Sequence, residues 1–445
     1  MRKNPIILVL IGLLFIGFTS CKEVTPSPTP TLPTAASAGT ADFSKYIAVG
    51  NSLTAGLTNG GLYNDGMQYA FPNLLAGQFA QVGGGAFVQP TFGTGKENGS
   101  GFLKLTDLKP TIVNETSSLA IIGVGADGKT NLLEKYTGDL NNLGIPGIKV
   151  AEVTTAGYGF NNAAGFNNYF ERLLGTSDAT SSYVDFVTAK AAGVTFFSCW
   201  MGGNDVLRYA VEGGATPEFI TPTTVFEANY KTLLDKFGSA KGILITIPKL
   251  TYAAHFTTVT LVNLQAAVKA GGGPDNADIY ITEGTGATVR KATAEDFFLL
   301  GKQTNYASLG KTDAGANNGF PYGLHPNNPL GTNLVLDKTE AAACNTAVDA
   351  YNAAIKTEAD ARGLAYLDIN TILGQAATAN GVTLNGITYR TAFIQGGIFS
   401  LDGIHLTPAG NAVATNEMIK VINAKYGSTI PELNNALYST LILSK

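Results

Sequence analysis

The sequence predicts an α/β fold whose mainly parallel sheet is flanked by helices. From Phe43 onward, short β-like runs alternate with stretches of helical spacing, and this alternation is typical of parallel sheets. The chain has 445 residues, of which 45% are hydrophobic and 14% charged, so it can bury a large core and is not disordered. Four runs are predicted strands: YIAVG (46–50), VTFFSCW (194–200), GILITIP (242–248) and LAYLDI (364–369).

Three longer segments have the apolar periodicity of helices. Residues 223–238 place their large apolar side chains on one face, and 336–362 and 408–425 show similar spacing. Pro408 is well suited to the first turn of the last of these helices. Between β-branched flanks, Asn385-Gly386 predicts a hairpin with a type I′ turn.

Two regions do not fit the alternation, and we expect them to be insertions: about 58–140 and about 251–335, both rich in Gly, Asn and aromatic residues. The run Gly123–Gly128 matches G-x-G-x-x-G, but its Asp-Gly pair favours a loop over a dinucleotide site. His255 and His325 lie in the second insertion without a third ligand nearby, so surface or cleft-lining roles are expected rather than a metal site.

The N-terminus has the features of a targeting segment. Two basic residues precede the apolar stretch 5–18, which is fourteen residues long and shorter than the roughly 20 needed to span a bilayer. Cys21 then follows two small residues, in a pattern that resembles the lipobox of bacterial lipoproteins. This resemblance implies cleavage of residues 1–20, a lipidated Cys21, a Pro/Thr/Ser-rich tether over 21–42 and a folded domain over 43–445. The alternative is an ordinary secretory signal with an incidental Cys.

With a lipid on Cys21, the protein would contact a membrane through its N-terminus. It would be lipid-anchored and extracytoplasmic in the cell envelope, on the periplasmic or surface face of the outer membrane. The net charge of −4 and the absence of a dense Lys/Arg stripe argue against nucleic acid as a partner. Three Cys residues form no disulfide framework, and structural roles are expected for Cys199 and Cys344.

A first candidate functional residue is Ser52, which directly follows the strand 46–50. At such a turn the hydroxyl is exposed at the C-terminal edge of the sheet, where ligands of open α/β folds bind. A nucleophile and a helix N-cap are both compatible with this position.

A second candidate is Asn204 in Gly202-Gly203-Asn204-Asp205, which follows the strand 194–200. The two Gly residues allow close backbone approach, and the Asn amide is a neutral donor of the kind found in oxyanion holes. The alternative is a Gly-rich turn in which Asp205 caps the next helix.

A third candidate is the pair Asp402 and His405, just before the helix that Pro408 begins. At this spacing the carboxylate can accept a hydrogen bond from one imidazole nitrogen and fix the tautomer. The other nitrogen is then free to act as a general base. An inert loop His is the alternative.

Together these motifs resemble the GDSL, or SGNH, hydrolase family, whose blocks occur in this order. They correspond to Gly50-Asn51-Ser52-Leu53, a Gly in Asn142–Gly147, Gly202–Asp205 and Asp402–His405. Gly144 and Gly147 both fit the second block, and Gly147 fits better. At position 51 this chain has Asn where the family usually has Asp. The resemblance implies a three-layer α/β/α fold of the flavodoxin-like type and no cofactor or metal.

The family resemblance also implies roles for these residues. Ser52 would be the nucleophile, His405 the base and Asp402 its orienting partner, with an oxyanion hole formed by Ser52, Gly147 and Asn204. The expected reaction is hydrolysis of carboxylic esters, and the substrate, of lipid or acetylated-glycan type, stays open. Oligomeric state also stays open.

Two long intervals separate the blocks, 147 − 52 = 95 and 402 − 204 = 198 residues, so the insertions are expected to roof or wall the cleft. There are two alternatives to an esterase. One is a catalytically inactive binding or adhesion lipoprotein on the same fold, which the Asn at position 51 favours. The other is a structural lipoprotein without a ligand.

Overall fold

The computed structural model describes residues 35–106, 111–162, 165–284, 286, 288–317 and 319–441. The expected signal peptide, Cys21 and most of the expected tether lie outside the described residues. Residues 36–445 group into one unit, to which the following description applies. No helix within the described ranges combines the length and apolarity needed to cross a bilayer.

A parallel sheet of five strands forms the centre of the fold, in the order β13-β8-β7-β1-β6. Gly50 pairs with Gly144 on one side and with Trp200 on the other, so three strands end at the same edge of the sheet. The four strands expected from the sequence are confirmed: β1 has the expected bounds, the other three are shorter than their apolar runs, and β6 is an additional strand. Their bounds are β1 (Tyr46–Gly50), β6 (Asn142–Gly144), β7 (Phe196–Trp200), β8 (Lys241–Ile245) and β13 (Ala365–Leu367).

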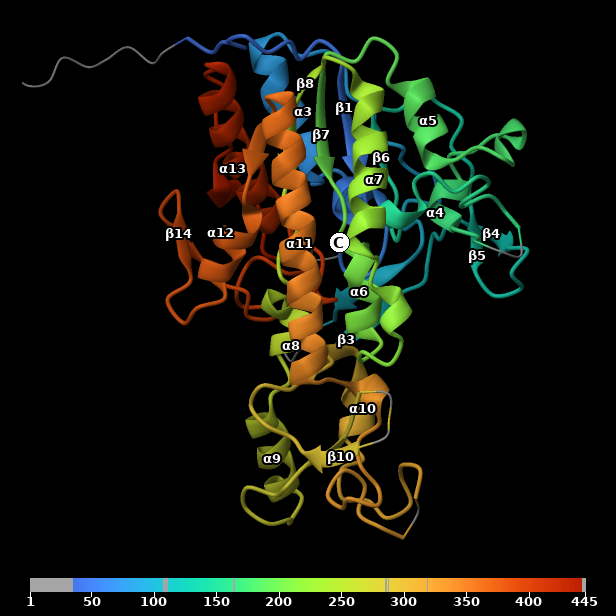
Figure 1. Cartoon of the computed structure of the whole chain (residues 1–445), viewed down its shortest axis with the longest axis vertical. Helices are drawn as coiled ribbons and strands as arrows, with labels where there is room; N and C mark the ends of the chain where they lie inside the picture. Colours follow the sequence, from blue (N-terminus) through green and yellow to red (C-terminus); the bar gives the residue numbers. More distant parts are fainter. Residues whose placement is uncertain are drawn as a thin grey trace, which may run out of the picture. The chain divides into compact units, whose positions relative to one another are not determined.

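Helices cover both faces of this sheet, as two neighbouring residues of β7 show. Phe196 and Phe197 point to opposite faces. The Phe196 ring lies 5.3 Å from Phe79 and 5.9 Å from Tyr426, whereas Phe197 stacks on Phe237 at 4.1 Å. Figure 1 shows α7 and α11 side by side in front of the sheet. The predicted three-layer architecture is therefore confirmed. The covering helices are α3 (Phe71–Phe79) and α13 (Pro408–Tyr426) on one face, and α7 (Thr223–Leu234) and α11 (Lys338–Arg362) on the other.

The range 58–140, expected to be an insertion, contains a helix of the main core. Phe71, Leu75 and Phe79 of α3 are buried there because their spacing places them on one helix face. The rest of the range includes two antiparallel hairpins, and the Gly123–Gly128 run lies at the end of β4 and in the turn that follows. It is not part of a strand–helix unit. The hairpins are β2 (Phe102–Leu105) with β3 (Ile112–Glu115), and β4 (Ile121–Val124) with β5 (Asn131–Leu133).

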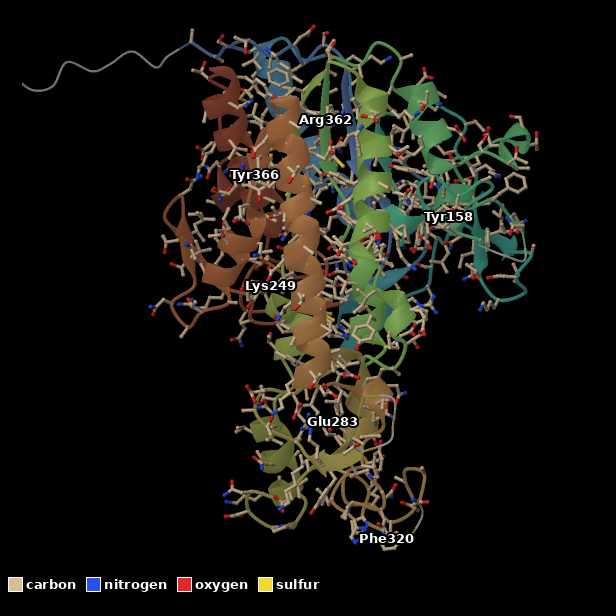
Figure 2. All side chains as sticks on the ribbon, in the orientation of Figure 1. Tyr158, Lys249, Glu283, Phe320, Arg362 and Tyr366 are labelled. Atoms are coloured by element: carbon tan, nitrogen blue, oxygen red, sulfur yellow. The ribbon has the colours of Figure 1, made fainter. Side chains whose placement is uncertain are left out.

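The range 251–335 includes a small lobe with its own apolar cluster, which contains Ile281, Phe298 and Leu330. Arg290 of this lobe donates to both carboxylate oxygens of Asp296 at 2.7 Å, and this bidentate pair links two segments of the lobe. In Figure 1 the lobe lies beyond the N-terminal end of α11, and Figure 2 labels Glu283 and Phe320 in it. The elements of this range and the strand that closes it are α8 (Ala254–Thr257), α9 (Leu261–Ala270), α10 (Gln303–Tyr306), β9 (Tyr280–Glu283), β10 (Thr288–Lys291), β11 (Phe297–Phe298) and β12 (Val335–Leu336).

The hairpin predicted from Asn385-Gly386 joins β14 (Val382–Leu384) to β15 (Ile387–Tyr389). Its two turn residues have φ of +50° and +80°, as a type I′ turn requires. The predicted helices are also present, with α7 extended by one turn of 3₁₀-helix over Asp235–Phe237. The remaining α-helices are α1 (Ser52–Ala55), α2 (Asn64–Met67), α4 (Asn168–Glu171), α5 (Tyr183–Lys190), α6 (Asn204–Val211) and α12 (Ile369–Ala376).

Candidate active site

Ser52 begins α1, directly after β1, at the C-terminal edge of the sheet. Gly50 makes this turn possible, because a Cβ there would lie 2.4 Å from the carbonyl oxygen of Trp200. The N-cap of α1 is Asn51, whose side-chain oxygen accepts from the N–H of Leu53 at 3.2 Å. Ser52 is therefore not the helix cap, and its hydroxyl is available for another partner.

That partner is His405, and a continuous hydrogen-bond chain links Ser52 to Asp402. The Ser52 Oγ lies 2.9 Å from Nε2 of His405, and Nδ1 of His405 lies 2.8 Å from Oδ2 of Asp402. Oδ1 of Asp402 accepts from the N–H groups of Ile404 and His405, both at 2.8 Å. Burial alone would raise the pKa of the Asp402 carboxyl, but the adjacent His405 and these N–H donors hold it well below its usual range.

The loop that carries Asp402 is held by residues that the sequence analysis did not select. Gly60 donates its backbone N–H to Oδ2 of Asp402 at 2.6 Å. Asn59 donates its backbone N–H to Oγ of Ser400 at 2.9 Å, and its side-chain oxygen accepts from the N–H of Leu401 at 3.0 Å. Asn59 is buried and has φ of +51°, a left-handed conformation that Asn tolerates better than most residues. The Asn59-Gly60 pair, a common turn dipeptide, was the available signal.

Of the two candidate oxyanion glycines, Gly147 lines the pocket beside Ser52, Asn204 and His405. Gly144 lies in β6, where a Cβ would come within 2.3 Å of the Ala55 nitrogen, so its role there is close packing against α1. Gly147 has φ of +85°, which favours glycine.

The peptide between Pro146 and Gly147 is oriented by Asn167. Its side-chain nitrogen donates to the Pro146 carbonyl at 2.9 Å and contacts the hydroxyl of Tyr158 at 3.0 Å. In a trans peptide the C=O and N–H groups point in opposite directions, so the Gly147 N–H points away from Asn167. Asn167 also caps α4, because its oxygen accepts from the N–H groups of two residues in that helix.

Asn204 and Asp205 begin α6 and hold the segment that follows Gly147. The Asn204 amide donates to the Ile148 carbonyl at 2.9 Å, which uses one of its two N–H bonds. The Asp205 carboxylate accepts from the N–H groups of Val150 and Ala151 at 2.7 and 3.1 Å, and burial raises its pKa to about 6. The alternative in which Asp205 caps α6 is therefore wrong, because the cap position is Gly203.

Comparison with known proteins identifies the family of the chain. The GDSL-like lipase/acylhydrolase family matches residues 46–418. The chain belongs to this family. The match supports ester hydrolysis as its general activity. It spans β1 through most of α13, and so includes every element that carries the side chains above.

Two solved structures are similar over most of their length. One is phospholipase A1 from Streptomyces albidoflavus NA297, which is 14% identical, with 86% of this chain and 100% of that chain covered and a TM-score of 0.33. Another crystal structure is 12% identical, with 86% and 98% covered and a TM-score of 0.34. No curated protein matches the chain.

Two pockets open onto Ser52 in this acylhydrolase-family fold. One is lined largely by apolar side chains and has a volume of about 630 Å³, part of it open to solvent. The other is more open, has a volume of about 730 Å³ and contains Gly147 and Asn168. Leu207, one turn after Asn204 in α6, lines both pockets.

The other residues considered from the sequence are not part of the hydrogen-bond chain from Ser52 to Asp402. Cys199 and Cys344 are buried free thiols whose pKa burial raises to about 12. His255 donates its backbone N–H to the Gly403 carbonyl at 2.9 Å. His325 stacks on Phe320 in the lobe. Within the described ranges, no group of three or more His, Cys, Asp or Glu side chains could hold a metal ion.

Proposed function

We propose that this family member is a serine ester hydrolase in which Ser52 is the nucleophile, His405 the general base and Asp402 its orienting partner. The observation that carries the proposal is the unbroken hydrogen-bond chain from Ser52 through His405 to Asp402, with distances of 2.9 and 2.8 Å. The depressed pKa of Asp402 supports it, because a carboxylate that stays ionised stabilises the imidazolium formed during the reaction.

In the proposed reaction, Ser52 Oγ attacks the ester carbonyl while its proton passes to Nε2 of His405. The tetrahedral intermediate collapses, the bond to the alcohol oxygen breaks, and His405 returns the proton to the departing alcohol. Water then adds to the acyl-Ser52 ester with His405 again as base, which releases the carboxylic acid and restores the hydroxyl. The oxyanion accepts hydrogen bonds from the N–H groups of Ser52 and Gly147 and from the second N–H of Asn204.

An organophosphonate probe tests this assignment. Ser52→Ala should abolish covalent labelling, and His405→Ala should abolish turnover, while both variants keep the wild-type circular dichroism spectrum. Asn204→Ala should lower kcat by about 10²–10³ with a smaller effect on KM, because its donor acts mainly in the transition state. Labelling that persists in Ser52→Ala would contradict the proposal.

An inactive binding protein on the same fold is the second candidate, and Asn51 is the observation that favours it. Asn51 nevertheless supplies the capping oxygen that an Asp would supply at the start of α1. Failure of the wild-type protein to react with the probe or to hydrolyse any ester would favour this candidate.

For cellular placement, we propose a lipid anchor on Cys21 and an extracytoplasmic location in the cell envelope. The motif Thr19-Ser20-Cys21 after the apolar stretch supports it.

A further inference from the structure

The two pockets that meet at Ser52 differ in chemistry. The larger part of the first pocket is lined by apolar side chains from the ends of β7 and β8, from α6 and α8, and from the loop of Asp402. These include Trp200, Leu207, Ile247, Leu250, Phe256 and Phe399. The pocket is also lined by one charged residue, Lys249. Its ammonium group forms an ion pair with Asp349 of α11 at 3.1 Å, and Figure 2 labels Lys249 beside that helix. The hydroxyl groups of a sugar would have few hydrogen-bond partners in this pocket, so burying them there would be unfavourable.

From this contrast we infer that the apolar pocket binds an extended alkyl acyl chain and that the open pocket takes the alcohol part of the ester. The inference rests on the proposed function and narrows it, because it selects esters of fatty acids over acetylated glycans. An acetyl group would leave most of the apolar walls uncovered. In a longer chain, each methylene group that moves from water into the pocket should raise the binding affinity about threefold to fourfold.

The wall of this pocket is attached to the residues of the hydrogen-bond chain. Ala253 and Phe256 line it from α8 and the residue before that helix. Between them, His255 donates its backbone N–H to Gly403 at 2.9 Å. Gly403 has φ of +73°, and a Cβ there would lie 2.7 Å from the His255 nitrogen, so the two segments are in close contact. The pocket wall formed by Ala253 and Phe256 is thereby held against the loop that carries His405.

Leu207 lies on the same helix as Asn204. Like Asn204 and His405 it lines both pockets, so an acyl chain and an alcohol group would both contact its apolar side chain near Ser52. The open pocket beyond it has more polar walls, with Asn168 donating to the Asn131 carbonyl at 3.0 Å. A polar alcohol group exposed to solvent fits that side.

The test is a series of p-nitrophenyl esters from acetate through butyrate and octanoate to dodecanoate, since the leaving group is constant and the acyl chain alone varies. For the wild-type protein, kcat/KM should rise at least tenfold from acetate to octanoate. Ala253→Val and Ala253→Phe should progressively fill the pocket and shift the optimum of kcat/KM to shorter chains, so that the ratio of octanoate to acetate hydrolysis falls with the size of the side chain. Ala343→Trp, at an exposed position of α11, is the matched control and should leave the profile unchanged.

A binding measurement separates this inference from the proposed catalysis. Ser52→Ala should bind cis-parinaric acid, as its fluorescence reports, and dodecanoate should displace it, whereas Ser52→Ala/Ala253→Phe should bind it at least tenfold more weakly. Hydrolysis with acetate as the best substrate and no shift in Ala253→Phe would overturn the inference and leave the catalytic proposal intact. Loss of all hydrolysis and labelling together with normal parinaric acid binding would overturn the catalytic proposal alone.

Discussion

The side-chain amide of Asn167 donates a hydrogen bond to the carbonyl of Pro146 across 2.9 Å, and this bond orients the peptide whose N–H belongs to Gly147. We expect Asn167→Asp and Asn167→Ser to lower kcat by about tenfold to a hundredfold with KM nearly unchanged, because a misaligned donor weakens the transition state more than the bound ester. Steady-state kinetics of both variants with one ester measures this split. Both replacements keep an oxygen that can cap α4, so the helix itself should persist.

Asn434 offers a matched control for this substitution. It is an exposed N-cap whose side chain accepts from the N–H of Ala436 at 3.1 Å, and Asn434→Asp and Asn434→Ser should leave kcat unchanged. Tyr158→Phe, which removes the other partner of the Asn167 amide, should also be nearly neutral in kcat. Normal kcat in both Asn167 variants would mean that this residue only caps α4.

Asn59 should be important for the position of Asp402. Asn59→Gly keeps the left-handed backbone and the backbone N–H to Ser400, but it removes the acceptor of the Leu401 N–H. We expect kcat/KM to fall by about tenfold, because the loop carrying Asp402 and His405 shifts, and unfolding to be easier by about 1–3 kcal/mol, because a buried N–H loses its partner. Kinetics well below the melting temperature and urea unfolding measure the two effects.

The control for that change is Asn385→Gly, which alters an Asn with nearly the same φ, +50°, in the exposed hairpin turn. Its kinetics should match the wild type. If Asn59→Gly loses stability but keeps its full kcat/KM, Asn59 stabilises the loop without positioning Asp402.

Glu340 should make the stability depend on pH. It lies in the first turn of α11, its Oε2 accepts from the N–H of Asp337 at 2.8 Å, and burial raises its pKa to about 7. In the unfolded chain the pKa is about 4.3. Between these values the folded state binds more protons, so the contribution of Glu340 to the free energy of unfolding falls as pH rises.

Glu340→Gln should therefore raise the free energy of unfolding by roughly 1–3 kcal/mol at pH ~8 and change it little at pH ~4. The Gln oxygen can still accept from Asp337. Thermal unfolding across this pH range measures the difference, and Glu218→Gln, at an exposed carboxylate, is the control. Parallel pH profiles for wild type and Glu340→Gln would show that Glu340 does not titrate in this range.

The proposed anchor depends on one thiol. Wild-type protein should partition with membranes when it is expressed from its full sequence, and Cys21→Ser should lose lipid labelling by a palmitate analogue, because the attachment atom is gone. Cys199→Ser, at a buried thiol, is the control and should keep the label. Recovery of unlabelled wild-type protein in the soluble fraction would contradict the proposal.

The sequence predicted the parts of the fold that have a strong local signal. The strands at 46–50 and 196–200 are apolar runs between polar turns, and α11 has a regular pattern over its whole length. β6 was missed because Asn142–Gly144 contains a single large apolar residue and is a strand only through its pairing with β1. α3 was missed because it contains Pro72 and Gly77 and lies in a Gly-rich region.

The same distinction holds for the candidate site. Ser52, Asp402 and His405 lie in short motifs, each with local signals. Asn59 and Asn167 act on residues that are distant in the chain or separated from them by an irregular loop, since Asn59 and Ser400 are 341 positions apart. No local pattern reports such a contact, and the Asn side chains involved are indistinguishable by sequence from those of ordinary turns.

The bond from Gly60 to Asp402 closes a loop of 342 positions and therefore has a consequence for the order of folding. Ser52 is synthesised early, whereas its proposed base and the helix α13 that follows come near the end of the chain. Contacts of such long separation form late, after most of the intervening chain has collapsed. A nascent or C-terminally shortened chain that ends before His405 would hold Ser52 without its imidazole partner, so the proposed hydrolysis could begin only once the C-terminal part has folded onto the rest.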